Sequence, residues 1–270
     1  DRVNHDVLMG RLAKRIADKR LLGVIRRYLE AGIMLNGVVM ERHEGTPQGG
    51  PLSPLLANVL LDEVDKELER RGHRFVRYAD DLNVYTGSKR AGEDVMRTLR
   101  RLFTRLRLRV NEAKSAVARP WERKILGFTF WESKDGTIKR TIAPKALNTM
   151  KHRIRDITSG TGGRRIKVVL VELRSYLRGW KEYFQLSETL WNLRDTDRWI
   201  RRRVRMVQLR QWKQGRTVYR KLRARGVPDR EAKGVAAHAT RYWAMAAHTA
   251  MNIAMPTSYF DAAGLPRLAT

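Results

Sequence analysis

The sequence contains no cysteine among its 270 residues. This absence excludes disulfide bonds, thiolate zinc sites and a cysteine nucleophile, and it fits a reducing compartment such as the cytoplasm. Acidic residues are also scarce, with 28 Asp and Glu against 56 Lys and Arg, which leaves a net charge of +28. Such an excess of positive charge indicates an acidic polymer as the partner, in particular a nucleic acid.

Long apolar runs are missing as well, so the sequence predicts no membrane partner. The six histidines show no close metal-ligand spacing. The chain opens at Asp1 without a methionine, a signal peptide or a transit pattern, and we therefore expect it to be a piece of a longer polypeptide. Hydrophobic residues make up 42% of the chain, enough for a core and for two compact domains.

The first domain, residues 1–143, is predicted to be α+β. Apolar residues at helical spacing predict helices within 6–30, from Ser53 to near Gly72, and around 95–106. Ser53 followed by Pro54 is typical of an N-cap and a first helical turn. Short alternating segments predict hairpins over 74–86 and over 125–142, the second one around the turn dipeptide Asp135-Gly136.

The second domain, residues 144–270, is predicted to be almost entirely helical. The flexible connector SGTGG at residues 159–163 interrupts it. The apolar stripe formed by Leu170, Leu173, Leu177, Trp180 and Phe184 is typical of a helix face that packs in a core.

The sharpest motif is YADD at residues 78–81, between two short apolar segments. Neighbouring residues on a regular strand point to opposite faces, so Asp80 and Asp81 can serve one metal site only where the chain turns. The predicted hairpin supplies such a turn. Paired carboxylate oxygens suit Mg²⁺ in a two-metal site, whereas the alternative is an ordinary solvated turn.

Several motifs, taken in order, resemble the palm of a reverse transcriptase from the group II intron maturase branch. They are GTPQGGPLSP at 45–54, LLANVLLD at 55–62, YADD at 78–81, NEAK at 111–114, LGF at 126–128 and LRGWKEYF at 177–184. The last of these resembles the maturase, or thumb, domain of the family. The resemblance spans almost the whole chain and implies an α+β fold, a partial right-hand polymerase palm followed by an all-α thumb.

The resemblance implies a role for each matching residue. Asp80 and Asp81 would be catalytic carboxylates that bind Mg²⁺. The residues around the incoming nucleotide would be Gln48, Gly49, Ala79 and Lys114. The primer grip would consist of Leu126, Gly127 and Phe128. The ordinary alternatives are a loop glutamine, a solvated surface lysine and a hairpin core.

The sequence departs from the family pattern in one respect. Polymerases of this type use a further aspartate on an earlier strand, whereas DRVNHD at residues 1–6 resembles the segment just after that strand. We therefore expect the fingers and the first palm strand to be missing and the chain alone not to polymerise. The nuclease domain that some relatives append is expected to be absent too.

The stretch 198–225 carries twelve Lys or Arg residues and no Asp or Glu, with aromatic residues interleaved. This composition predicts RNA binding, in which basic side chains contact phosphates and aromatic rings stack on unpaired bases. The alternative is a helix with tryptophans in the core and solvated arginines. The residues predicted to bind RNA are Arg198, Arg201, Arg202, Arg203, Arg205, Arg210 and Lys213.

Taken together, the motifs predict an RNA-directed DNA polymerase of a group II intron that also binds intron RNA and assists splicing and mobility. Its partners would be intron RNA, an RNA template with a DNA primer, dNTPs, and either a second copy or a complementing upstream polypeptide. It would reside in the cytoplasm, at the nucleoid or in a ribonucleoprotein. The alternatives are a maturase that binds RNA without polymerising and an unrelated basic RNA-binding protein.

Overall fold

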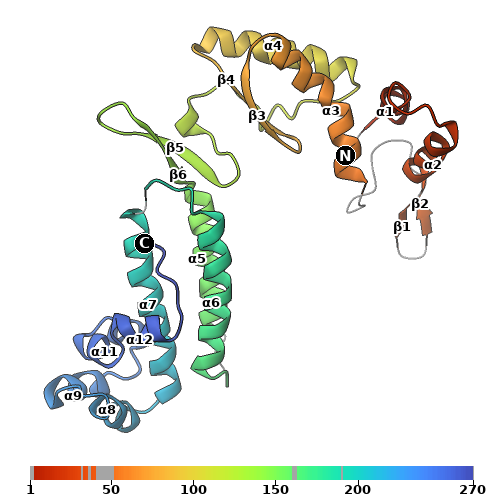
Figure 1. Cartoon of the computed structure of the whole chain (residues 1–270). Coiled ribbons are helices and arrows are strands. Elements are labelled where there is room, and N and C mark those ends of the chain that lie inside the picture. The colour runs from red at the N-terminus through yellow and green to blue at the C-terminus, as the bar shows by residue number, and fades with distance from the viewer. Residues whose placement is uncertain are drawn as a thin grey trace. The chain divides into compact units, whose positions relative to one another are not determined.

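The computed structural model shows two compact units, Asp1–Arg119 and Pro120–Thr270, and each is described by itself (Figure 1). The structure describes residues 3–31, 33–35, 38–40, 52–159, 163–189 and 191–269. Within these residues helices combine with small antiparallel sheets, which is consistent with an α+β fold for the chain.

The first unit contains helices and two hairpins in alternation. In chain order its elements are α1 (His5–Leu12), α2 (Lys19–Glu30), β1 (Ile33–Leu35), β2 (Val38–Met40), α3 (Ser53–Arg70), β3 (Arg74–Tyr78), β4 (Asp81–Tyr85) and α4 (Lys89–Arg105). Two N-caps explain where helices begin, because Asp18 accepts from the amides of Arg20 and Leu21, and Ser88 accepts from the amide of Ala91.

Helix α3 organises the core of this unit. Its buried residues Leu56, Leu60, Val64 and Leu68 recur every fourth position and form one apolar face. Helix α3 contacts β3, and α4 contacts β4. Partly buried apolar side chains of the hairpin pack against the same core, namely Phe75, Leu82 and Val84. The hairpin is thereby held on one face by apolar packing.

The predicted start of α3 needs a small correction. The helix begins at Ser53, and the residue in the N-cap position is Leu52, so Ser53 is the first helical residue and not the cap. Pro54 lies in the first turn, where its missing amide hydrogen costs no intrahelical hydrogen bond. The predicted stop is confirmed, because α3 ends at Arg70 and Gly72 adopts a φ of +70°.

The second unit begins with a hairpin and continues as helices. Its elements are η1 (Pro120–Glu122, a 3₁₀ turn), β5 (Phe128–Glu132), β6 (Ile138–Ile142), α5 (Pro144–Ser159), α6 (Ile166–Tyr183), α7 (Trp191–Trp212), α8 (Gly215–Arg223), α9 (Asp229–Ala237), α10 (Tyr242–Met245), α11 (Thr249–Ala254) and α12 (Thr257–Ala262). The predicted apolar stripe on α6 is confirmed as a core face, since Leu170, Leu173 and Leu177 are buried.

Helix α7 is the central element of the second unit. It contacts α5, α6, α8 and α10. The carboxylate of Asp197, in the N-terminal third of this helix, is buried and accepts hydrogen bonds from the backbone amides of Leu268 and Ala269. The chain therefore returns to α7 after α12 and closes the core from that side (Figure 1).

The hairpin β5–β6 belongs to the second unit, whereas the expected boundary at residue 144 places it in the first domain. It is tied to the segment after α6 by the amide of Glu188, which donates to the Arg140 carbonyl at 2.9 Å. The hydroxyl of Thr189 donates to that of Thr141 at 2.6 Å. These bonds are invisible to a pattern search because they join residues 48 positions apart. The assignment of functional domains to 1–143 and 144–270 stays a prediction.

A glycine at the start of α8 provides a test of the packing between α8 and α9. A Cβ at Gly215 would lie 2.6 Å from the carbonyl oxygen of Ala236. We expect Gly215→Ala to lower the free energy of unfolding by about 1–3 kcal/mol, because backbone must shift to admit the methyl group. The control is Gly179→Ala in α6, where a Cβ meets nothing within 4 Å and helix propensity predicts a gain of about 0.5–1 kcal/mol. Equal thermal melting of the Gly215→Ala and parent chains would contradict this packing.

Candidate active site and nucleic-acid interface

The two candidate catalytic carboxylates lie at the tip of the β3–β4 hairpin. Tyr78 pairs with Asp81 across the antiparallel strands, so Ala79 and Asp80 form a two-residue turn. Ala79 has a φ of 54°, the left-handed region that side chains with a Cβ disfavour. The predicted turn is thus confirmed, and both Asp80 and Asp81 are exposed. A chain that turns here can present neighbouring carboxylates to one ligand.

These carboxylates fit only part of a Mg²⁺ site. Two hard oxygen donors side by side suit the ion, but a two-metal site takes more ligands than one pair of aspartates provides. Among the residues that the structure describes, no group of three or more His, Cys, Asp or Glu side chains gathers to hold a metal. The pair alone supplies two oxygen-donor side chains, and a complete site of this kind would need further ligands.

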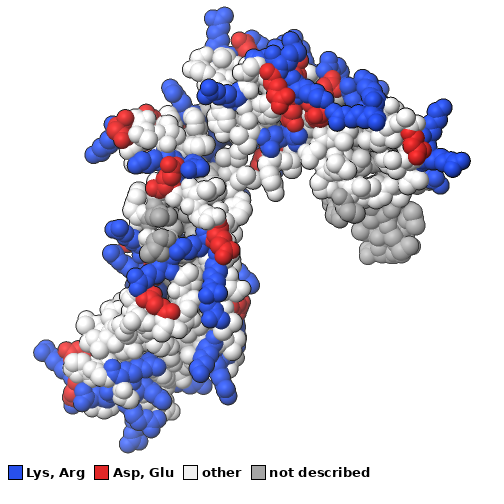
Figure 2. Space-filling view, in the orientation of Figure 1, with Lys and Arg blue, Asp and Glu red and all other residues white. Residues whose placement is uncertain are grey.

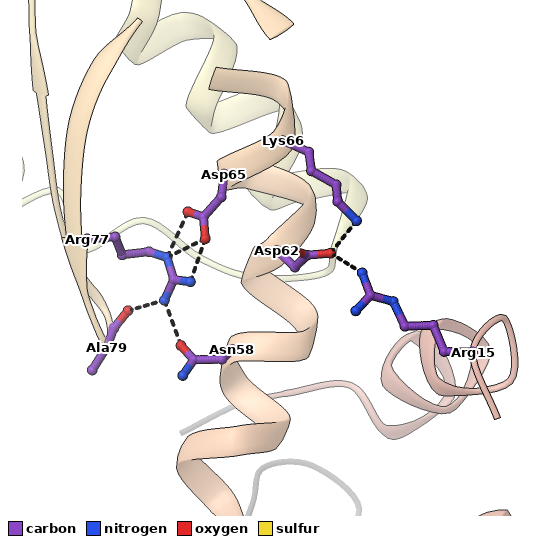
Figure 3. Close-up of polar contacts among 7 residues, drawn as sticks. All are labelled: Arg15, Asn58, Asp62, Asp65, Lys66, Arg77 and Ala79. Carbon is purple, nitrogen blue, oxygen red and sulfur yellow. Dashed lines mark hydrogen bonds and ion pairs between the residues drawn. The ribbon is translucent and has the colours of Figure 1, made fainter. Parts of the chain in front are cut away.

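Arg77, which precedes the turn on β3, is a functional candidate that the motifs did not identify. Its guanidinium donates to Asp65 and Asn58 on α3 and to the carbonyl of Ala79 in the turn (Figure 3). The hydrogen bonds to Asp65 raise the pKa of Arg77 above its ordinary value. The signal in the sequence was present but weak, namely an arginine at a core-facing position of a strand.

The residues expected around the nucleotide are only partly described. Gln48 and Gly49 lie outside the described residues. Lys114 is exposed in a turn after α4, where its amide donates to the carbonyl of Asn111 at 3.0 Å. Ala79 lies beside the carboxylates, as the motif requires. The nucleotide-binding roles of these four residues stay predictions.

The expected primer grip forms a tight turn in the second unit. Leu126 and Gly127 both have positive φ values, 50° and 80°, and the flanking residues Ile125 and Phe128 form an isolated β-bridge. The turn packs on the end of α6, because the Tyr183 hydroxyl donates to the Leu126 carbonyl at 3.1 Å. A Cβ at Gly127 would approach the Phe184 ring at 3.0 Å. The position therefore needs glycine, and the role in holding a primer stays a prediction.

Three of the arginines predicted to bind RNA make internal contacts along α7. Arg202 donates to the Trp243 carbonyl and lies 4.0 Å from the centre of its ring. Arg203 donates to the hydroxyl of Thr158 at 2.7 Å. Arg205 donates to the Met255 carbonyl at 2.7 Å and lies over the ring of Phe260. These side chains fasten neighbouring elements to α7.

Burial separates Arg205 from the rest of the basic stretch. The residue is only 8% exposed, and burial lowers its pKa to about 10, so the guanidinium remains charged at neutral pH. Burial also lowers the pKa of Arg203 below its ordinary value. The guanidinium of Arg205 donates to the buried carbonyl of Met255, so this side chain is placed to stabilise the fold. The composition of the stretch had predicted a contact with phosphate instead.

The other predicted RNA-binding residues are more accessible. Arg198 is exposed and forms an ion pair with Asp195 at 3.0 Å. Arg201 and Arg210 are half-buried, and Lys213 is exposed. Helix α8 contributes further exposed basic residues of the stretch 198–225, beyond the seven predicted to bind RNA: Arg216, Arg220 and Lys221. Figure 2 shows Lys and Arg side chains gathered over α8 and α9. We call Lys213, Arg216, Arg220 and Lys221 the α8 basic face.

The aromatic residues of the basic stretch are largely packed. Trp212 is buried with Arg225 over its ring, at 4.9 Å from the centroid. Trp199 is half-buried and lies near the guanidinium of Arg155. The burial of Trp212 and Trp199 thus supports the alternative in which the tryptophans of this stretch pack in the core. Trp212 would have to leave the core to stack on a base. A more exposed tryptophan, Trp191 at 67%, begins α7.

The described helices include no segment with both the length and the apolar character needed to cross a membrane. Two family models match the sequence. The model described as "Reverse transcriptase (RNA-dependent DNA polymerase)" matches residues 1–130. The model described as "Group II intron, maturase-specific domain" matches residues 147–226. The first match contains the carboxylate turn, and the second contains α7 and the whole α8 basic face.

Relatives from three organisms are similar over shorter segments. The chain is 42% identical over 66 residues to "Group II intron-encoded protein LtrA" of Lactococcus lactis subsp. cremoris, covering 24% of this chain and 11% of LtrA. It is 39% identical over 71 residues to "Protein YkfC" of Escherichia coli (strain K12), covering 26% and 19%. It is 36% identical over 75 residues to "Uncharacterized 91 kDa protein in cob intron" of Schizosaccharomyces pombe, covering 28% and 9%.

These matched segments span less than one fifth of each of the three relatives. The order of the two family models along the chain nevertheless reproduces the order of the motifs, with the polymerase palm before the maturase domain. The carboxylate turn and the basic helical unit each lie within the expected model. The chain belongs to the family of group II intron-encoded reverse transcriptase and maturase proteins.

Proposed function

We propose that the chain serves RNA-directed DNA synthesis and intron RNA binding in a group II intron ribonucleoprotein. The observation that carries the proposal is the pair of exposed carboxylates at a two-residue turn, within the segment that matches the reverse transcriptase model. The helical unit with its exposed basic face supports the second activity. Splicing chemistry itself would belong to the RNA, which the protein would bind and stabilise.

Asp80 and Asp81 would contribute two of the ligands that hold Mg²⁺. In polymerases the metal pair clamps the attacking and leaving oxygens of the phosphoryl transfer. The remaining carboxylate would come from an upstream palm segment. Ala79 would leave room for the nucleotide beside the carboxylates, and Gln48, Gly49 and Lys114 would contact the dNTP. Leu126, Gly127 and Phe128 would hold the primer end on the RNA template.

A second candidate function is that of a maturase that binds RNA without polymerising. The observation in its favour is the incomplete donor set, because no third carboxylate joins Asp80 and Asp81 among the residues that the structure describes. Either function would place the chain in a cytoplasmic ribonucleoprotein or at the nucleoid. Primer extension separates the two.

The first test compares two aspartates that both lie at hairpin turns. In a primer-extension assay with Mg²⁺, we expect the chain alone to be inactive and to gain activity when an upstream palm segment carrying its aspartate is added. Asp80→Asn should abolish the restored activity, because it removes a ligand charge without changing size. The matched control, Asp135→Asn in the β5–β6 turn, should leave it intact. Equal activity of the Asp80→Asn and parent chains would refute the metal-ligand role.

The second test concerns the α8 basic face. Replacing Lys213, Arg216, Arg220 and Lys221 with Gln should weaken binding of structured RNA and make its salt dependence less steep. The logarithmic slope should lose about 0.7–0.9 for each phosphate contact removed. Titrations at several salt concentrations measure it. An unchanged slope would place the phosphate contacts on another surface.

Arg205→Ala is the control for the quadruple variant, because it removes a positive charge that is buried and that we do not expect to contact RNA. We expect Arg205→Ala to lower the free energy of unfolding by about 2–4 kcal/mol, because it leaves the buried Met255 carbonyl without its donor and opens space beside Phe260. The salt dependence of RNA binding by the folded fraction should stay as in the parent chain. A slope reduced as strongly as in the quadruple variant would show that Arg205 reaches phosphate after all.

A further inference from the structure

A charged side chain occupies an apolar position on the strand that leads to the carboxylate turn. Along β3 the exposure alternates, with Phe75 and Arg77 half-buried and Val76 and Tyr78 exposed. Phe75 packs against the core of the first unit, so Arg77 lies on the same face of the hairpin. Its side chain retains only 13% exposure. A guanidinium in this place needs partners for its donors.

Helix α3 provides the main partner. Nε of Arg77 donates to Oδ1 of Asp65 at 2.8 Å, and Nη2 donates to Oδ2 at 2.5 Å. This is the two-pronged arrangement in which arginine binds a carboxylate most strongly. Asp65 is itself only 22% exposed. The pair therefore fixes the direction of the Arg77 side chain relative to α3.

The remaining nitrogen joins the helix to the turn. Nη1 of Arg77 donates to Oδ1 of Asn58 at 2.8 Å and to the carbonyl oxygen of Ala79 at 2.9 Å (Figure 3). Asn58 and Asp65 are two helical turns apart and present their oxygens on one face of α3. One guanidinium thus contacts the helix twice and also the backbone of the residue that precedes Asp80.

A neighbouring carboxylate on α3 has its own partners. Asp62 accepts from Lys66 at 2.7 Å and from Arg15 at 2.7 Å. The hydrogen bond from Lys66 lowers the pKa of Asp62 below its ordinary value, and the charge of Arg77 acts in the same direction. Figure 3 shows the two sets of contacts as separate groups on either side of the helix. Among the contacts drawn in Figure 3, Arg77 is the cation that binds Asp65, whereas Lys66 and Arg15 bind Asp62.

The cost of this arrangement points to a role beyond stability. A largely buried ion pair gains little over an apolar pair of similar size, because both charges must leave water. Ala79 adds strain, since its φ of 54° is disfavoured for a residue with a Cβ. The Arg77 bond to the Ala79 carbonyl holds this strained residue in place. Strain of this kind persists where the surrounding structure fixes it.

We propose that Arg77 is a positioning residue that fixes the Asp80–Asp81 turn relative to α3. It acts through the Ala79 carbonyl and touches no reacting group. Its effect on turn geometry stands by itself, whereas its effect on catalysis rests on the proposed polymerase function. Packing of Phe75, Leu82 and Val84 holds the hairpin as a whole, and Arg77 adds the constraint at the tip.

The test measures amide hydrogen exchange in the full chain. In Arg77→Met, exchange in the 74–85 peptide should rise about tenfold or more, because a charge-assisted hydrogen-bond set is lost. Arg77→Lys, which keeps the charge but lacks the fork, should give an intermediate rise. The matched control is Arg100→Met, since Arg100 binds Glu112 through Nε at 2.9 Å and Nη2 at 2.7 Å and has the same sequence separation of 12 residues. It should leave the hairpin peptide unchanged.

Circular dichroism shows whether each variant is folded, and Arg77→Lys carries the test if Arg77→Met unfolds. Unchanged exchange of the hairpin peptide in both Arg77 variants would overturn the proposal, as would an equal rise in Arg100→Met. Primer extension with the upstream segment added gives the second readout, where kcat should fall with KM for dNTP nearly unchanged. If the parent chain extends no primer under any condition, the polymerase function fails, while faster hairpin exchange would still establish the positioning role.

Discussion

The candidate active site depends on the hydrogen bonds that the guanidinium of Arg77 donates to α3 and to the carboxylate turn. The β3–β4 hairpin is a two-stranded sheet among the described residues, and a sheet of this size gains most of its stability from packing against another element. Apolar side chains of the hairpin pack against the core that α3 and α4 help to form. At the tip of the hairpin, hydrogen bonds take the place of apolar packing: Arg77 donates to Asp65, to Asn58 and to the Ala79 carbonyl. A turn that exposes two carboxylates can thereby remain ordered without being buried.

The excess of positive charge shapes the second unit in a similar way. With 56 basic and 28 acidic residues, many arginines have no carboxylate to pair with. Several turn inward and donate to backbone carbonyls beside aromatic rings, as Arg202 does at Trp243 and Arg205 at Met255. Such bonds satisfy carbonyls at the ends of short helices. The α8 basic face remains exposed, and it is this face that suits a phosphate backbone.

Sequence patterns predicted the elements of the fold well, because helical and strand periodicities are local properties. The hairpin with Asp80 at its turn, the apolar stripe of α6 and the end of α3 near Gly72 are confirmed. Local patterns carry no information about contacts between residues that are distant in the sequence. Hydrogen bonds in both directions between Glu188 and Arg140 tie the β5–β6 hairpin to the second unit. The arginines of α7 carry no periodic signal that separates the buried Arg205 from the half-buried arginines near it.

The candidate site shows the same division between local and distant information. The YADD motif located the carboxylates, because the motif itself forms the turn. Arg77 has only a weak local signal, because its partners lie 12 and 19 positions away on α3. The role of a charged residue in a strand can be inferred only when the residues on the facing helix are known. A search for arginines at core-facing strand positions, paired with acidic residues on the preceding helix, would have found it.

We propose that the Asp80–Asp81 turn is the place where this chain binds a divalent metal. The most direct measurement is a titration with Mn²⁺ followed by nuclear magnetic resonance of the backbone amides, since the paramagnetic ion broadens the signals of nearby residues. Our account predicts that broadening begins at residues 78–83, before it reaches the turn at Asp135 and Gly136, and that Asp80→Asn weakens it. Broadening that begins elsewhere and spares residues 78–83 would contradict the account.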